Sequence, residues 1–470
     1  MCAKSKSAQP YSETGKTLSV FQRIGFGVGD FGLNGFYTGL NLFLLYYYTD
    51  VLQIRPALAG LLFAAPLVWD AVTDPLMGII ASRTRSRWGR LRPYLLFGCA
   101  PLALSFAGLF AAPIMFPSTV FAASLVAHLI FRTVFTVVAV PYSALTANLT
   151  SDSGERGALT AFRMTFATLG GLAVAASMLP ISDILAPGDR RLGIFLTSLI
   201  YAAIGAAAIA AAFLSTRERV DTEQAVQFSL SEFARQFVLN RPLMVLLAAI
   251  FIAGMGSAIF AKAIIYYVER VLPFKLSITL PLTVLMACIA FSIPIWGYIS
   301  KHIEKRTAWL TGSMIVLASQ LVLFFMPPTS AAPFLALIAV SGFGHAAYVV
   351  TFWSMLPDTV EVGEWRTGAR AEAVIYGVNQ LVLKAGSALG IALLGVALDL
   401  IGYEASAVLG AQTIESLPNV AIGLPMACLI VSIVIISFYR VDRALHARLV
   451  TQLNHRRHRH AGFTLDRRHA

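Results

Sequence analysis

The chain has 470 residues, of which 57% are hydrophobic and only 13% are charged, and its mean hydropathy is +0.73. Soluble domains average roughly 45–50% apolar and about 25% charged residues, so this composition excludes a water-soluble globular protein. The net charge of +12 does not indicate a nucleic-acid partner, because no aromatic residue interleaves the basic run at 455–460.

Apolar segments long enough for a membrane-spanning helix, about 20 residues, recur along the whole chain. Turn residues such as Pro327 and Pro328 divide a long uncharged stretch into two such segments. The sequence therefore predicts an all-α integral membrane protein with twelve transmembrane helices. Their expected positions are 22–52, 57–82, 93–113, 116–149, 158–182, 192–214, 242–270, 276–300, 307–326, 331–358, 371–402 and 418–440.

A polar linker divides the twelve predicted helices into two groups of six. The expected organisation is a tail at 1–21, a six-helix bundle at 22–214, a linker at 215–241, a second bundle at 242–440 and a basic tail at 441–470. The first tail lacks the apolar core and cleavage site of a signal peptide, so the first span is expected to stay in the mature protein.

The positive charges predict the orientation. Most of the 36 Lys and Arg residues lie in the two tails, the linker and the even-numbered loops. Cytoplasmic loops of membrane proteins carry such an excess of Lys and Arg. We therefore expect a multi-pass protein of the cell inner membrane with both termini and the linker in the cytoplasm.

Charged residues inside the predicted spans are candidate functional residues. A charge near the bilayer centre costs at least about 2.5–3.5 kcal/mol on insertion scales, so it is seldom present without a purpose. The predicted spans contain Asp30, Asp70, Asp74, Arg132, Arg163, Lys262 and Lys384. Four positive charges against three negative ones make the interior mildly basic, which favours an anionic substrate.

Asp70 and Asp74 in the second span predict a cation site. They are four residues apart, so both carboxylates lie on one face of a helix, and Thr73 adds a hydroxyl beside them. This oxygen-rich group suits Na⁺, while repulsion between two desolvated carboxylates favours a bound proton. The alternative is a structural network in which the acids only neutralise buried Arg or Lys residues.

Three further helix faces carry candidate residues three or four positions apart. In the fourth span they are Arg132, Thr136, Ala139 and Ser143. In the first span they are Asp30, Asn34 and Tyr37, and in the eleventh they are Tyr376, Gln380 and Lys384. The face in the first span suits either a hydroxyl-rich solute or a polar contact between helices.

The isolated cations have two interpretations each. Arg132 is either the counter-ion of the two acids or a ligand for an anionic substrate group. Lys384 either contributes to the substrate site or pairs with Asp70 or Asp74. Lys262 either extends toward a membrane interface or contacts the substrate.

Several motifs resemble the glycoside-pentoside-hexuronide:cation symporter family, a branch of the major facilitator superfamily. The first half carries Gly29-Asp30-Phe31, YYYTD at 46–50, WDAVTDP at 69–75 and RSRWGRLRP at 85–93. The second half carries DTVEVGE at 358–364, Gly368-Ala369-Arg370 and LKAGS at 383–387. The matches are spread over roughly residues 20–440.

The resemblance implies two six-helix bundles that rock around a central site and expose it alternately to each side of the membrane. It implies a cation site at Asp70, Asp74 and Thr136, with Thr73 at a position that influences the choice of cation. It also implies that Asp30 and Arg163 hydrogen-bond a sugar, that Tyr37 lies nearby, and that Lys384 lies close to the cation. No cofactor is expected, and no metal beyond Na⁺ at the two acids.

Departures from the family pattern concern the substrate. Ala139 replaces an acid shared by sugar and cation, and Ser143 and Val349 replace two tryptophans that shape the sugar pocket. Two kinds of substrate fit these losses. One is a smaller or anionic sugar, such as a pentoside, hexuronide or sulfonated sugar, bound through Arg132, Arg163 and Lys262. The other is a lysophospholipid-like or other anionic or zwitterionic solute.

Other classes of function fit the sequence poorly. A membrane-embedded enzyme needs a nucleophile with its base or a cluster of metal ligands, and no span has such a spacing. A channel is likewise not indicated, because no selectivity filter or ring of charges is present. We therefore expect a transporter that works as a monomer in the lipid bilayer on a small-molecule substrate.

Overall fold

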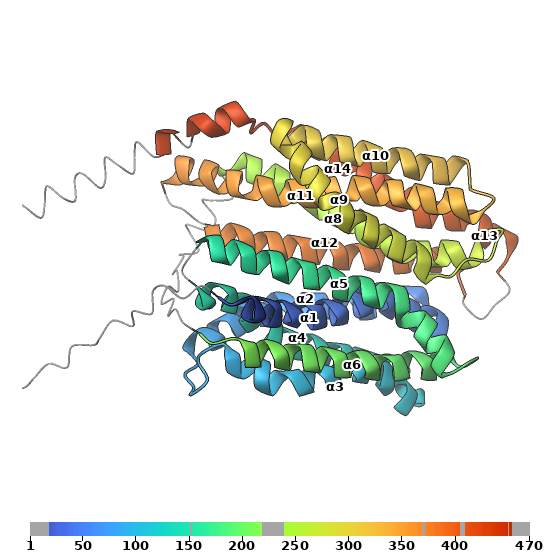
Figure 1. Ribbon diagram of the computed structural model, residues 1–470. Coiled ribbons are helices and arrows are strands. Elements are labelled where there is room, and N and C mark those ends of the chain that lie inside the picture. Colours follow the sequence, from blue (N-terminus) through green and yellow to red (C-terminus); the bar gives the residue numbers. More distant parts are fainter. Residues whose placement is uncertain are drawn as a thin grey trace, which may run out of the picture.

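The computed structural model describes residues 18–150, 153–218, 239–368, 372–404, 409–449 and 451–453 (Figure 1). All the regular structure in these ranges is helical, without a β-strand. The prediction of an all-α protein is therefore confirmed. Most of the predicted linker and of both tails lies outside the described residues.

The helices form two bundles of six spans. The first bundle consists of α1 (Val20–Tyr46) with its continuation η1 (Tyr47–Val51), α2 (Pro56–Arg83), α3 (Arg92–Met115), η2 (Pro117–Thr119) with α4 (Val120–Leu149), α5 (Ser153–Leu185) and α6 (Arg190–Ser215). The second consists of α8 (Arg241–Arg270), α9 (Thr279–His302), α10 (Lys305–Phe325), α11 (Ala331–Thr367), α12 (Glu372–Leu400), and α13 (Ala411–Pro418) with η3 (Asn419–Gly423) and α14 (Leu424–Ser437).

Eleven helices of the described chain are long and apolar enough to cross a membrane. α1 is not among them, because Asp30, Asn34 and its many glycines lower its hydropathy. It is nevertheless packed within the first bundle, where it contacts α5 and α6. A buried central helix needs a less continuous apolar surface than a helix that faces lipid, so α1 completes the twelve predicted spans.

Two helices extend beyond their predicted ends. α11 was expected to end near residue 358, yet it continues to Thr367 and stops where Gly368 adopts a φ of +77°. The extension is stabilised by its charges, because Lys305 donates to both carboxylate oxygens of Asp358 at 2.8 and 2.7 Å. The last span begins at Ala411, seven residues before its predicted start.

Glycines allow the helices of the first bundle to approach closely. A Cβ atom on Gly170 of α5 would lie 2.3 Å from the backbone oxygen of Phe31, and one on Gly32 would lie 2.9 Å from that of Gly205. Such contacts between small residues are typical of helix pairs in membranes, where packing rather than burial from water drives association.

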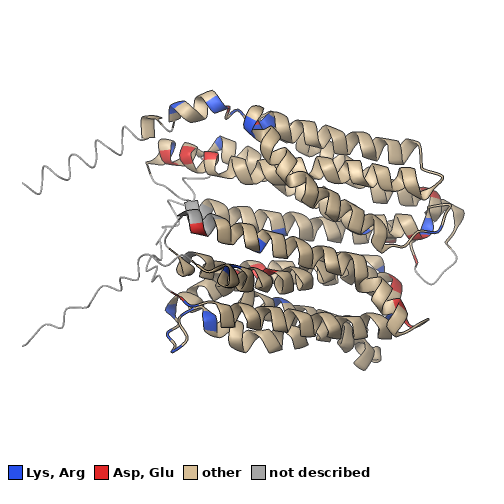
Figure 2. Ribbon diagram, viewed as in Figure 1, with Lys and Arg blue, Asp and Glu red and all other residues tan. Residues whose placement is uncertain are grey.

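We call the side of the molecule where α1 begins the terminal side and the opposite side the distal side. The described residues 442–449 and 451–453 also lie on the terminal side (Figure 1). Charged residues concentrate near the helix ends on both sides, and few lie along the middle of the helices (Figure 2). This distribution agrees with helices whose central portions lie in the hydrocarbon of a bilayer.

The two bundles contact each other mainly through α2 with α12 and α5 with α9. On the distal side a Cβ atom on Gly395 of α12 would lie 2.4 Å from the backbone oxygen of Pro56 at the start of α2. Five polar contacts, which we call the distal contacts, also join the bundles there. They are Thr49 with Tyr266, Asp50 with Tyr403, Asp50 with Arg270, Arg55 with Asp399, and Arg190 with Glu269.

The described hydrogen bonds and ion pairs between the bundles include the distal contacts and, near the middle of the helices, those of Lys384 with Asp70 and Asp74. The described structure is closed on its distal side.

The close contact at Gly170 predicts the effect of adding a methyl group. Gly170→Ala should lower the free energy of unfolding by about 1–3 kcal/mol, because the new methyl overlaps the α1 backbone. Gly108→Ala in α3 is the matched control, since a Cβ there would meet nothing within 4 Å. Thermal unfolding of the two variants in detergent tests this, and equal melting temperatures would contradict the packing of α1 on α5.

Candidate functional site

The two acids of α2 lie in a charged cluster at the boundary between the bundles. Arg132 of α4 places Nη2 3.3 Å from Oδ2 of Asp70, and both side chains are only 3% exposed. Lys384 of α12 donates to the same oxygen at 3.3 Å and also to Oδ2 of Asp74. Thr136 donates to Oδ1 of Asp74 at 2.7 Å. We call these five residues the acid cluster.

The acid cluster is neutral overall and has one unused acceptor. Two carboxylates face one guanidinium and one ammonium, so its formal charges balance. Among the described residues, Oδ1 of Asp70 has no hydrogen-bond partner although it is buried. A buried carboxylate oxygen without a donor is costly in a protein interior, and it is a ready ligand for a cation or a proton.

Lys384 is the member of the cluster that comes from the other bundle. Its side chain and that of Asp74 are about one-third exposed, at 30% and 32%, while Asp70 is enclosed. A lysine ammonium bound to two carboxylates occupies the place where a small cation would bind. Of the two alternatives for Lys384, the structure therefore shows the pairing with both acids.

A second buried ion pair lies in the first bundle, between α1 and α5. Arg163 donates through Nε to Oδ2 of Asp30 at 2.5 Å and through Nη1 to the hydroxyl of Thr146 at 2.6 Å. Tyr142 donates to Oδ2 of Asp30 at 3.1 Å. Asp30 is thus held by one cation and one hydroxyl. We call Asp30, Arg163, Tyr142 and Thr146 the Asp30 site.

Other predicted residues do not join these two groups through described hydrogen bonds. The hydroxyl of Thr73 donates to the backbone oxygen of Trp69 at 3.2 Å, and the amide of Asn34 donates to that of Asp30 at 3.1 Å. Tyr37 is 42% exposed, with its ring 6.3 Å from that of Phe135, and Gln380 is exposed on α12. Short polar side chains on helices commonly bond to the preceding turn in this way.

Lys262 differs from the other three intramembrane cations. It is 4% exposed in α8, and its ammonium lies 5.0 Å from the centre of the Phe63 ring in α2. No acid of the described chain pairs with it. The expectation that it extends to a membrane interface therefore does not describe this arrangement.

Sequence reasoning missed two members of the Asp30 site and an exposed tryptophan of α11. Tyr142 and Thr146 are four apart on α4 and hydrogen-bond Asp30 and Arg163, respectively, so their spacing was an available signal. Trp353 lies one turn beyond Val349 on α11, is 41% exposed, and stacks 6.4 Å from Tyr376 of α12. The family pattern indicates the loss of a tryptophan at position 349, but an indole is present one helical turn away.

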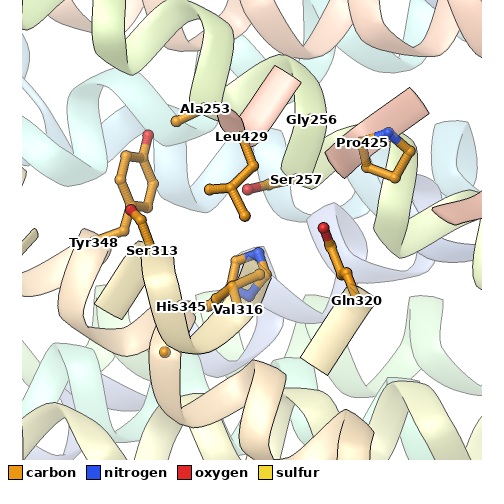
Figure 3. Close-up of a pocket in the computed structure, with 11 residues that line it drawn as sticks. Ala253, Gly256, Ser257, Ser313, Val316, Gln320, His345, Tyr348, Pro425 and Leu429 are labelled. Carbon is orange, nitrogen blue, oxygen red and sulfur yellow. The ribbon is translucent and has the colours of Figure 1, made fainter. Parts of the chain in front are cut away.

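A small cavity of about 30 Å³ lies inside the second bundle, among α8, α10, α11 and α14 (Figure 3). Ser257, Ser313, Gln320, His345 and Tyr348 contribute polar groups to its lining. Sites for drug-sized ligands have volumes of roughly 300–1,000 Å³, whereas this one has room for one or two waters. It is therefore too small for a sugar-sized substrate.

Comparisons with known proteins agree with this architecture. The model of the family described as MFS/sugar transport protein matches residues 25–443. The symporter YnaJ of Bacillus subtilis is 32% identical over 95% of this chain and 97% of its own. The isoprimeverose transporter of Lactiplantibacillus pentosus is 27% identical over 93% of this chain and 92% of its own.

A solved structure confirms the fold. The nucleoside transporter NupG superimposes with a TM-score of 0.67 at 12% identity, covering 89% of this chain and 99% of NupG. The two bundles are therefore those of the major facilitator fold. The chain belongs to the MFS/sugar transport protein family and, within it, to the glycoside-pentoside-hexuronide:cation symporters, which are secondary transporters and not enzymes.

Proposed function

We propose that this transporter couples the movement of H⁺ or Na⁺ to that of a sugar or sugar acid by alternating access. The observation that carries the proposal is the acid cluster, in which Lys384 of one bundle holds Asp70 and Asp74 of the other. A coupling cation that binds the acids must compete with this lysine. Cation binding then alters the contact between the bundles, which is what coupling requires.

The cluster offers oxygen ligands for either cation. Oδ1 of Asp70 is free among the described residues, and displacement of Lys384 would release Oδ2 of Asp74. The hydroxyl of Thr136 is within 2.7 Å of Asp74 and keeps its oxygen lone pairs. Arg132 would remain on Asp70 and hold it in place during the exchange. Hard cations such as Na⁺ prefer this kind of all-oxygen site.

The Asp30 site supports a hydroxyl-rich substrate. Its carboxylate accepts hydrogen bonds and its guanidinium donates them, and both are shielded from bulk water, where such bonds are strongest. The stacked pair of Trp353 and Tyr376 could supply the apolar face that a sugar ring needs. The isoprimeverose transporter, a relative along most of the chain, makes a sugar the preferred substrate class.

We further propose that the terminal side faces the cytoplasm and that the monomer is the functional unit. The support for this orientation is the excess of Lys and Arg in the tails and even-numbered loops. In that orientation the distal contacts close the extracellular side. The inner membrane of the cell would be its location.

Neutralising either acid should uncouple transport. In proteoliposomes with an imposed Na⁺ or pH gradient, Asp70→Asn and Asp74→Asn should show no accumulation of a labelled sugar above its external concentration. Exchange of internal for external sugar should persist, because it needs no net cation movement. Glu415→Gln, which removes an exposed acid of α13 that belongs to neither polar group nor to the distal contacts, is the matched control.

The gradient that drives uptake by the wild-type protein identifies the cation. Accumulation that survives unchanged in both asparagine variants would show that the acid cluster does not couple transport. Loss of exchange as well as accumulation, with a normally folded protein, would show that the acids bind substrate instead.

The Asp30 site can be separated into structural and substrate roles. Arg163→Met should lower stability by about 3–5 kcal/mol, because it leaves Asp30 buried without its cation. The double variant Asp30→Asn/Arg163→Met should recover most of that stability but not sugar uptake. Melting curves and uptake are measured on the same preparations, and a double variant that transports normally would exclude this pair from the substrate site.

A further inference from the structure

The positive charge that is left over inside the membrane is located on Lys262. Arg163 is paired with Asp30, and Arg132 and Lys384 share the two acids of the acid cluster. Each of those groups is formally neutral. Lys262 therefore carries the excess of one positive charge, since within the described ranges it has an aromatic ring and no acid beside it.

Lys262 lies between the acid cluster and the distal contacts, at the boundary of the two bundles. It belongs to α8 of the second bundle, and the ring against it, Phe63, belongs to α2 of the first. Phe63 precedes Asp70 by two helical turns, which is about 10 Å toward the distal side. The Lys262 side chain thus lies next to a surface that separates when the distal side opens.

An ammonium in this position lacks adequate compensation. A cation over an aromatic face gains about 0.5–2 kcal/mol, which is less than the cost of removing an unpaired charge from water. A carboxylate or sulfonate would supply the missing opposite charge and accept charge-assisted hydrogen bonds. Asp70 and Asp74 of α2 are already engaged by Arg132 and Lys384, so an anion that compensates Lys262 would come from outside the chain.

We propose that Lys262 binds the acidic group of the substrate, and that the transporter selects sugar acids over neutral sugars. This inference rests on the proposed function. When the distal side opens, Phe63 moves away and the ammonium becomes accessible to an entering anion. On closure, the ring returns over the ion pair and excludes water from it. A neutral sugar would leave the ammonium unpaired and is disfavoured for that reason.

Two ligands that differ only in charge test the proposal. Methyl β-D-glucuronide carries a carboxylate where methyl β-D-glucoside carries a hydroxymethyl group. The wild-type protein should bind and take up the glucuronide about 10- to 100-fold better, the usual range for a charge-assisted contact. Lys262→Gln should reduce this preference to about that of a neutral site, while Lys262→Arg should retain most of it.

Stability distinguishes a ligand-binding lysine from a structural one. Lys262→Gln should melt at or above the wild-type temperature, because it removes an unpaired buried charge. Lys384→Gln is the matched control, and it should melt lower because two acids lose their partner. A fall in melting temperature for Lys262→Gln, with selectivity unchanged, would identify the lysine as structural and overturn the inference.

The outcomes separate this inference from the proposed function. Uptake of neither glycoside, nor of other sugars, would remove the proposed function and the inference with it. Gradient-driven uptake of both glycosides with equal efficiency would leave the function standing and overturn the role of Lys262. A preference for the glucuronide that persists in Lys262→Gln would do the same.

Discussion

The hydrocarbon interior does not tolerate an unpaired charge, and the central part of this protein is organised by that constraint. The acids of α2 are neutralised by Arg132 from within the same bundle and by Lys384 from the other bundle. The first pairing lies within one bundle and can persist through a transport cycle. The second crosses the moving boundary, so it has to break or reform whenever the bundles rearrange.

The same two helices that carry the exchangeable ion pair also carry a close backbone contact between the bundles. Gly395 of α12 packs against the start of α2, and it follows Lys384 by eleven residues, or about 16 Å along the helix. Release of Lys384 would therefore weaken the α2–α12 interface at its centre while the glycine contact and the distal contacts still hold its end. Opening of the distal side then depends on how strongly the glycine contact and the distal contacts stabilise the closed state, and not on cation binding alone.

The positions of the helices could be predicted from the sequence, but the contacts between their charged side chains could not. Length and hydropathy located the spans, and α1 was included among them although its polar residues and glycines lower its hydropathy. α11 was placed too short, since Asp358 and the following charges resemble a loop until Lys305 is known to neutralise them. Hydropathy measures preference for lipid, and it cannot detect a charge that another helix compensates.

The sequence predicted which charged residues make up the candidate site, but not which of them pair with each other. Helical periodicity gave the shared face of Asp70 and Asp74, but it could not say whether Arg132 or Lys384 would meet them. That choice depends on which helices are neighbours. The same limit applies to Lys262, whose distinguishing property is the absence of an acid close by in the described chain. Trp353 was missed because only position 349 was compared with the family pattern, and the indole lies one turn further along α11.

Helix α4 carries residues of both the acid cluster and the Asp30 site. It therefore offers a route by which the proposed cation site can be linked to the proposed sugar site, although position 139 has no acid. Arg132 and Thr136 belong to the acid cluster, while Tyr142 and Thr146 belong to the Asp30 site. Thr136 and Thr146 are about 15 Å apart on one continuous helix. Ala139, at the position where the family pattern has an acid shared by sugar and cation, has no polar side chain that could bond to either group. A shift of α4 that follows the exchange of Lys384 for a cation would move Tyr142 and Thr146 against Asp30 and Arg163, so the rigid helix itself can transmit the coupling.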